Sequence, residues 1–383
     1  MEALDGIETL KLNNAVNWVQ RRWDGYTASV ARSSIRVKNT SNVIISFSTA
    51  IQQINTVLLV ILGTYLIHSD DPHNRITMGA LIAAVILSGR ALAPLGQIAS
   101  LATRFQQARL AMQGVNEIVR RPVERESQTH YLTVKDIQGE FHFSAVTFFY
   151  KPELPAALKG MSVCIRPGEK VGIIGTIGCG KSTLLKMMVG LYRQNKGQIT
   201  LDGVAMQQLD PCFVRDKVFL LEQNPRLFLG TLRENLQLSR LPGSLSDVDM
   251  INAAGRFGFD RFIRHHPCGL DMQIGEGGQG LSGGQRQMVA LTRMVLGSPR
   301  VVLLDEPTTG LDLQTENIVL KGLNHWSRGR TMVVVTHRLQ VLNIVDRIIV
   351  MNEGRVMMDG PRDEILKKLS GKQQSGESRA ITS

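Results

Sequence analysis

A short apolar stretch that runs into a glycine-rich loop constrains this chain more than any other feature. Residues 170–175 read KVGIIG, and the loop that follows places glycines at 175, 178 and 180 before Lys181, Ser182 and Thr183. Without side chains in the way, backbone N–H groups can ring a phosphate at the start of a helix. We therefore predict a strand–loop–helix unit that binds phosphates. Lys181 is expected to reach the β- and γ-phosphates, and the Ser182 hydroxyl to bind Mg²⁺.

A second apolar stretch ends in two carboxylates. Residues 301–312 read VVLLDEPTTGLD, with Asp305 and Glu306 at the end of the apolar part. Beside a phosphate loop, such an aspartate holds Mg²⁺, often through water, and the next carboxylate is placed to polarise the attacking water. The alternative is a surface acidic pair that merely ends a strand.

The pattern of apolar and polar residues along the chain changes near residue 120. After a polar segment, 121–137, strands and helices alternate, and the continuous apolar strands VVLLD and TMVVVT predict a buried parallel sheet in an α/β domain. We expect helices after Gly180, Gly230, Ser246, Gly283, Leu313 and Pro361, and a disordered tail from 371 to 383. The expected strands are 140–149, 162–166, 171–175, 198–202, 218–221, 301–305, 331–336 and 347–352.

Two long stretches before residue 120 are almost free of charge. Residues 39–67 carry none, and residues 76–103 carry only Arg90. Each is long enough to cross a bilayer. Arginines flank the outer ends, whereas the turn SDDPHNR is net negative, which predicts a membrane hairpin with its ends in the cytoplasm. The alternative is a pair of buried helices in a soluble helical domain.

Composition excludes several classes. The 383 residues are 43% hydrophobic and 20% charged, so the chain is neither collagen-like nor wholly disordered. The cysteines form no CxxC pair, which argues against a zinc site or a disulfide framework. The net charge of +11 suits nucleic acid, anionic lipid or phosphorylated ligands alike. The four cysteines are Cys164, Cys179, Cys212 and Cys268.

The order of the motifs resembles one family. The loop GTIGCGKST, Gln223 in LLEQNPRLF, LSGGQRQ at 281–287, LLDEPTTGLD and VTHR follow one another as in the nucleotide-binding domain of ATP-binding-cassette (ABC) exporters. The resemblance covers residues 138–365 and extends into the helical part before them. It implies a P-loop NTPase domain of α/β fold, preceded by an all-α transmembrane segment.

The resemblance also implies roles for single residues. Tyr150 would stack on adenine, Gln223 would touch Mg²⁺ and sense the γ-phosphate, and Asp312 would belong to the loop that links two ATP sites. His337 would bind the γ-phosphate beside Glu306, with Lys181 as the third catalytic residue. Taken alone, Tyr150 is a surface aromatic and His337 a structural histidine. The implied Mg²⁺ ligands are Ser182, Gln223 and Asp305. The implied ATP-binding residues are Tyr150, Gly175, Thr176, Ile177, Gly178, Cys179, Gly180, Lys181, Ser182, Thr183, Gln223, Ser282, Gly283, Gly284, Gln285 and Asp312.

The LSGGQ segment predicts a dimer. Ser282, Gly283 and Gly284 stand at a helix start, where unpaired N–H groups and the positive dipole end lie. In the family this surface caps the ATP held by the partner's P-loop. The sequence departs from the common pattern at Glu222, at Met294 and at Cys179, but no catalytic group is lost. We therefore expect an active ATPase that uses ATP and Mg²⁺.

The exported substrate and the missing helices follow only from resemblance. The stretch LDMQIGEGGQG before LSGGQ is similar to type I protein-secretion ATPases, with Glu276 meeting cytoplasmic helices of the membrane domain. The hydrophobic runs would be the fifth and sixth helices of six. The chain would then be a fragment, a truncated product or part of a split transporter. A lipid, peptide or drug exporter is the alternative, and a soluble ABC ATPase acting on nucleic acid a remote one.

These expectations define the domain organisation of the chain. Residues 1–120 form part of an exporter membrane domain, 121–137 a linker, 138–370 the nucleotide-binding domain and 371–383 a tail. We expect a multi-pass protein of the cytoplasmic membrane with its ATPase domain in the cytoplasm. Its expected partners are a second cassette, in a homodimer or heterodimer, a membrane-fusion adaptor and an outer-membrane channel. No nucleic-acid partner is expected.

Overall fold

The chain divides into two compact units, Met1–Pro122 and Val123–Ser383, which are described separately below. The structure is a computed structural model. It describes residues 2–68, 76–121, 123–125, 130–132, 134–238 and 244–374.

The first unit is helical. Two short helices, α1 (Glu2–Asp5) and α2 (Ile7–Leu12), precede the long helices α3 (Val16–Ile67) and α4 (Met78–Val119). Helix α3 contains the whole uncharged run 39–67, and α4 contains residues 78–103 of the second run; each helix continues into an arginine-containing flank, because such residues are also good helix formers. Helix α3 is long and apolar enough to cross a membrane, and many of its large apolar side chains are exposed.

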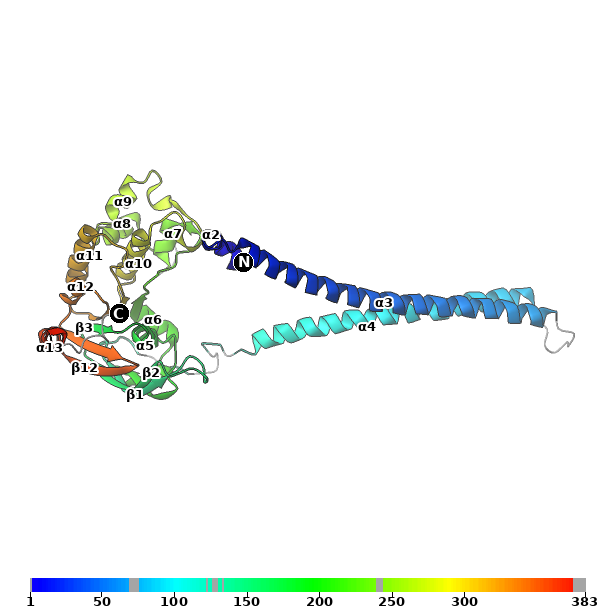
Figure 1. Cartoon of the computed structure of the whole chain (residues 1–383), viewed down its shortest axis with the longest axis horizontal. Helices are drawn as coiled ribbons and strands as arrows, with labels where there is room; N and C mark the ends of the chain where they lie inside the picture. The colour runs from blue at the N-terminus through cyan, green and yellow to red at the C-terminus, as the bar shows by residue number, and fades with distance from the viewer. Residues whose placement is uncertain are drawn as a thin grey trace. The chain divides into compact units, whose positions relative to one another are not determined.

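Helices α3 and α4 pack against each other (Figure 1). Gly63 packs closely against Leu81: a Cβ on Gly63 would come within 2.2 Å of the Leu81 Cδ1 atom. At a second contact between the two helices, the Asn55 amide of α3 donates a hydrogen bond to the Ser88 hydroxyl of α4. A small residue and a polar pair are the contacts that hold helices together in an apolar solvent. Arg90 is exposed on α4.

The second unit is built on a six-stranded sheet in the order β12-β11-β3-β10-β9-β6. Its five parallel strands are β3 (Lys170–Gly175), β6 (Val218–Leu221), β9 (Val301–Asp305), β10 (Thr331–Val335) and β11 (Arg347–Asn352). Every residue of β9 and β10 is buried, as their continuous apolar sequences predict. Strand β12 (Arg355–Pro361) pairs antiparallel with β11. None of its residues is buried, so it lacks the continuous apolar sequence by which the other strands of this sheet were predicted.

The other strands do not join that sheet. Strands β1 (Phe141–Phe148), β2 (Leu158–Ile165), β4 (Lys196–Leu201) and β5 (Val204–Ala205) form a separate antiparallel sheet in the order β2-β1-β4-β5. The predicted strands near residues 140, 162 and 198 therefore exist, but they belong to a second sheet. Strands β7 (Gly230–Thr231) and β8 (Gln273–Ile274) make a short pair.

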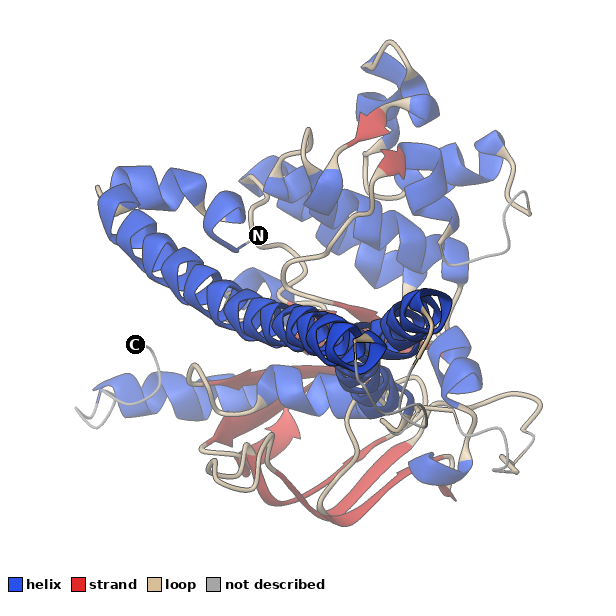
Figure 2. Ribbon diagram, turned by 90° about the vertical axis from the view of Figure 1, so that its right-hand side faces the viewer, coloured by secondary structure: helices blue, strands red, loops and turns tan. Residues whose placement is uncertain are grey.

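Helices pack beside the strands of this unit, and Figure 2 shows them in blue next to the red strands. All six predicted helix starts are present within two residues. The helix that ends the chain reaches Gln374, so residues 371–374 are helical rather than part of a tail, and 375–383 lie outside the described residues. The helices are α5 (Lys181–Met188), α6 (Pro211–Lys217), α7 (Leu232–Gln237), α8 (Asp247–Gly255), α9 (Asp260–His265), α10 (Gly283–Gly297), α11 (Leu313–Trp326), α12 (Leu339–Leu342) and α13 (Arg362–Gln374).

The segment before the first strand is docked onto this unit. The Arg215 guanidinium of α6 donates two hydrogen bonds to the Glu124 carboxylate, and Arg125 pairs with Asp210 at 2.8 Å. Leu132 forms a bridge with Leu209. The described parts of the predicted linker are therefore held by the cassette.

Candidate functional site

The phosphate loop joins β3 to α5, as the sequence predicts. Lys181 is the first residue of α5, and only 8% of its surface is exposed. Its ammonium donates hydrogen bonds to the carbonyl oxygens of Gly175, at 2.8 Å, and Thr176, at 2.9 Å. The cation is thus held inside the curve of the loop, where phosphate oxygens can take over these contacts. Cys179 is 3% exposed, so burial keeps its thiol away from oxidants in the solvent.

Glycine is required in this loop for a steric reason. Gly180, the N-cap of α5, has φ +99°, and a Cβ there would lie 2.5 Å from the Ala157 carbonyl oxygen. At Gly178, with φ +79°, the backbone conformation rather than crowding demands glycine. Glycine at these two positions therefore allows the loop to adopt this conformation.

Tyr150 lies beside the loop. It follows β1, and its hydroxyl is 2.9 Å from the hydroxyl of Thr183 on α5. The ring meets Phe148 and Tyr192 edge to face, with centroids 5.0 and 5.3 Å away, and half of the residue is exposed. An exposed aromatic ring fixed next to the phosphate loop is suited to stacking on a purine base.

The two carboxylates lie at the carboxyl end of β9, which is the edge of the sheet where the phosphate loop also begins. Asp305 is 7% and Glu306 8% exposed. Glu306 has φ +51°, an uncommon conformation for a residue with a side chain, and its N–H donates to the Val335 carbonyl at 2.9 Å. This backbone bond turns the Glu306 side chain toward the end of β10. Strain of this kind concentrates at functional sites.

His337 meets Glu306 at that end. The His337 Nε2 atom lies 3.8 Å from a Glu306 carboxylate oxygen, and the Thr336 hydroxyl is 3.5 Å from the other. Burial raises the pKa of Glu306, and the neighbouring His337 opposes that rise. A carboxylate with a raised pKa beside a histidine is equipped to orient water and accept a proton.

The LSGGQ segment starts helix α10. Ser282 is its N-cap: the hydroxyl accepts a hydrogen bond from the Gln285 N–H at 3.2 Å, and the Gln285 side chain accepts one from the Ser282 N–H at 2.8 Å. This capping box fixes the helix start while Ser282 and Gly283 stay exposed. The positive end of the α10 dipole is therefore presented to solvent.

The segment after the carboxylates packs against that helix start. A Cβ on Gly284 would come within 3.0 Å of the Gly310 carbonyl oxygen. Asp312 caps α11 by accepting hydrogen bonds from the N–H groups of Gln314 and Thr315 at 3.0 Å. Hydrogen bonds, that of the Thr315 hydroxyl foremost, lower the pKa of Asp312. In this chain the Asp312 side chain thus holds the loop rather than reaching outward.

The residues implied for Mg²⁺ offer a suitable donor set. Ser182 supplies a hydroxyl, Asp305 a carboxylate and Gln223 an amide oxygen, all of them hard oxygen donors. Gln223 is exposed two residues beyond β6, which pairs with β9, so it follows a neighbouring strand at the same edge. Among the described residues no cluster of three His, Cys, Asp or Glu forms an all-protein metal cage. Mg²⁺ needs no such cage when phosphates and water complete its shell.

Two residues that contact these elements were missed by the sequence analysis. Arg338, next to His337, pairs with Glu316 of α11 at 2.9 Å. Tyr192 packs on Tyr150. Only the three-dimensional contacts reveal these two residues. Glu316, a single glutamate among the apolar residues of the amphipathic helix α11, was nevertheless a signal in the sequence that a cation such as Arg338 would pair with it.

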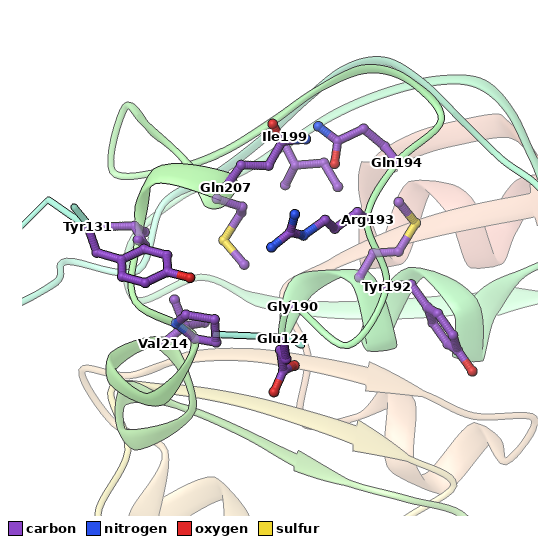
Figure 3. A pocket seen from close by; sticks show the side chains of 13 residues that line it. Glu124, Tyr131, Gly190, Tyr192, Arg193, Gln194, Ile199, Gln207 and Val214 are labelled. Carbon is purple, nitrogen blue, oxygen red and sulfur yellow. The ribbon is translucent and has the colours of Figure 1, made fainter. Parts of the chain in front are cut away.

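A small hollow in the same unit is separate from the phosphate loop. It lies at the far end of α5, where Gly190, Tyr192 and Arg193 meet Tyr131 and Glu124 (Figure 3). Its volume of about 40 Å³ leaves little more than room for water. We assign it no role in nucleotide binding.

Known proteins match both units. Residues 158–309 match the ABC transporter family. The chain is 32% identical over 371 residues to the toxin RTX-I translocation ATP-binding protein of Actinobacillus pleuropneumoniae, and 33% identical to the leukotoxin translocation ATP-binding protein LktB of Mannheimia glucosida. These alignments cover 97% of this chain and 51% of each relative, so the chain spans about half the length of these curated relatives.

A solved structure shows the same fold. A bacterial Atm1-family ABC exporter with ATP bound superposes with a TM-score of 0.84 at 24% sequence identity, over 98% of this chain and 66% of that one. The likeness shows that the chain shares the fold of this exporter, and its residues 158–309 match the ABC transporter family.

Proposed function

We propose that this chain is the ATP-hydrolysing subunit of an ABC exporter. The exporter binds ATP and Mg²⁺ between two cassettes and uses ATP hydrolysis to drive export. The Glu306–His337 pair beside the phosphate loop supports it most directly, with 3.8 Å between the Glu306 oxygen and His337 Nε2. A structural P-loop alone would not need a buried carboxylate with a raised pKa at that edge.

Each residue of the proposed ATP site has its own role. Lys181 exchanges its loop carbonyl contacts for the β- and γ-phosphates, and Tyr150 stacks on the adenine ring. Ser182, Asp305 and Gln223 would hold Mg²⁺, which would neutralise negative charge on the phosphates. Glu306 accepts a hydrogen bond from the attacking water, and His337 holds the γ-phosphate.

The second cassette completes each site. The exposed N-terminus of α10, with Ser282 and Gly283, is a positive helix end that caps the ATP bound by the partner. ATP therefore holds together the two cassettes of a homodimer or heterodimer, and its hydrolysis lets the cassettes separate.

Membrane placement and substrate belong to the same proposal. Helices α3 and α4 form a hairpin of the membrane domain, so that the protein is a multi-pass protein of the cytoplasmic membrane. The two relatives described above are toxin and leukotoxin translocation ATP-binding proteins. We infer a protein substrate for this chain too, delivered with a membrane-fusion adaptor and an outer-membrane channel. A carbonate wash tests the placement: the chain should stay in the membrane pellet.

The Glu306→Gln substitution tests the ATPase itself. This variant should bind ATP with wild-type affinity, lose turnover and accumulate as a dimer with ATP, because the carboxylate orients water but does not hold the nucleotide. Size-exclusion chromatography with ATP and Mg²⁺ measures the dimer. Lys181→Ala is the contrasting variant, since it removes the fixed cation and should weaken ATP binding itself. Wild-type turnover in Glu306→Gln would remove Glu306 from the mechanism.

A further inference from the structure

Three cations stand in one row at the sheet edge opposite the phosphate loop. Val218, Val301 and Thr331 are register partners on the adjacent parallel strands β6, β9 and β10. The residue immediately before each is basic: Lys217, Arg300 and Arg330. Neighbouring strands are about 4.8 Å apart, so the three backbone positions span about 10 Å.

Backbone hydrogen bonds fix this row. The Arg300 N–H donates to the Lys217 carbonyl at 2.9 Å, and the Thr331 N–H donates to the Arg300 carbonyl at 3.3 Å. The three basic residues are thus set side by side by the sheet itself. Like charges held in adjacent positions repel each other, which makes the row costly without a counter-charge.

The side chains border a hollow of about 460 Å³. A fourth cation, Arg328, lines it, and its acidic lining is limited to Asp136 among the described residues. The Asp136 carboxylate already accepts a hydrogen bond from the Ile137 N–H at 2.9 Å. The hollow therefore carries an excess of positive charge.

Among the described residues, only one of these four cations, Lys217, has a carboxylate partner. Lys217 lies 3.3 Å from its exposed neighbour Asp216, and no described carboxylate comes within 4.0 Å of Arg300, Arg328 or Arg330. Arg330 donates instead to the Pro299 and Trp326 carbonyls, at 3.1 and 2.7 Å, and lies over the Trp326 ring. Burial first, and then Arg256 and Arg300, lower the pKa of Arg330.

From this row we infer an anion-binding site, separate from the ATP site, that takes clustered phosphate groups. Guanidinium forks bind phosphate oxygens through paired charge-assisted hydrogen bonds. A row of about 10 Å matches two or three neighbouring phosphates. Either a free polyphosphate or the headgroups of anionic lipids supply that chemistry. Among the described residues that line the hollow, none is an aromatic on which a nucleic-acid base would stack.

The test uses the full chain in nanodiscs of neutral lipid, with a non-hydrolysable ATP analogue saturating the phosphate loop. Inorganic tripolyphosphate is titrated by calorimetry. Lys217→Gln/Arg300→Gln should weaken its binding at least about tenfold, since charged hydrogen bonds are lost. Arg330 is left intact because it ties α10 and α11 to the sheet. The matched control is Lys196→Gln/Lys321→Gln, which removes the same charge from exposed positions and should change binding less than about twofold.

Hydrogen exchange distinguishes the two sources. Protection of residues 328–331 on adding tripolyphosphate identifies a free anion, whereas protection on changing to phosphatidylglycerol nanodiscs identifies lipid headgroups. Protection by neither probe overturns the site, as does an equal loss of affinity in the control variant. Tighter binding of a single-stranded oligonucleotide of equal charge would overturn the ligand assignment. Failure of this site leaves ATP binding untouched, so it is distinguishable from failure of the proposed function.

Discussion

Glu316 on α11 and Arg338, the residue after His337, form an ion pair with 2.9 Å between carboxylate oxygen and guanidinium nitrogen. The carboxylate is almost fully buried, and its second oxygen has no hydrogen-bond partner in the described part of the chain. The Glu316 N–H also donates to the carbonyl of Asp312, the N-cap of α11. The pair thus joins the start of α11 to the loop that holds His337.

Glu316→Gln should therefore slow turnover more than it weakens ATP binding. The amide cannot balance the Arg338 charge, so the His337 loop loses its anchor while the phosphate loop is unchanged. Steady-state kinetics should show a fall in kcat of about tenfold or more with a KM within about twofold. Asp363→Asn, which breaks the exposed Arg362–Asp363 pair, is the control. A mutant that changed KM alone would contradict this role.

The stability effect of Glu306→Gln should depend on pH. Burial raises the folded-state pKa of Glu306, so its ionised form destabilises the folded state. That cost is absent below the unfolded pKa, grows as pH rises, and is complete above the folded pKa. The thermal midpoint of Glu306→Gln should therefore exceed that of wild type at neutral pH. The difference should shrink on acidification, and a gap that widens in acid would reverse the sign of the pKa shift.

His337→Ala should move the acid limb of the residual turnover. His337 opposes the rise in the Glu306 pKa, so its removal leaves that pKa higher. Turnover needs the ionised carboxylate and should then begin at a higher pH than in wild type. The profile of residual kcat against pH measures the shift, and an unshifted limb would show that another group controls it.

Two substitutions at Ser282 separate its roles. Ser282→Arg should abolish hydrolysis and spare ATP binding, because the bulk blocks the surface that faces the partner's ATP. Ser282→Thr keeps the hydroxyl cap and should retain most turnover. Nucleotide affinity is measured on the monomer by equilibrium dialysis. Loss of ATP binding there in Ser282→Arg would place the residue in its own chain's site.

Packing of the hairpin depends on Gly63. Valine at this position would overlap Leu81, where the Cβ alone meets Cδ1 at 2.2 Å, and should cost about 1–3 kcal/mol. The Asn55 and Ser88 side chains report on this pairing because they bond across the helices. An Asn55→Cys/Ser88→Cys protein should form an interhelical disulfide readily, and Gly63→Val should lower its yield. Gly25→Val, in open space on α3, is the control.

The sequence by itself determined the elements that depend on local pattern. The glycines of the phosphate loop, the unbroken apolar strands β9 and β10 and the capping residue Ser282 each specify a local backbone, so their places were predicted correctly. The long helices were predicted too short, because hydropathy marks the apolar part of a helix and not its polar continuation. Residues 371–374 were assigned to a tail for a similar reason, since a polar last turn has no apolar periodicity.

Only the tertiary structure decided which strands share a sheet and which residues meet. Strands β1, β2 and β4 pair with one another because register and partner choice depend on contacts far apart in the sequence. Glu316 finds Arg338 across 22 residues, and Lys217, Arg300 and Arg330 become neighbours only because β6, β9 and β10 are adjacent. A sequence pattern specifies the conformation of a segment. The meeting of distant charges is set by the packing that buries the whole sheet.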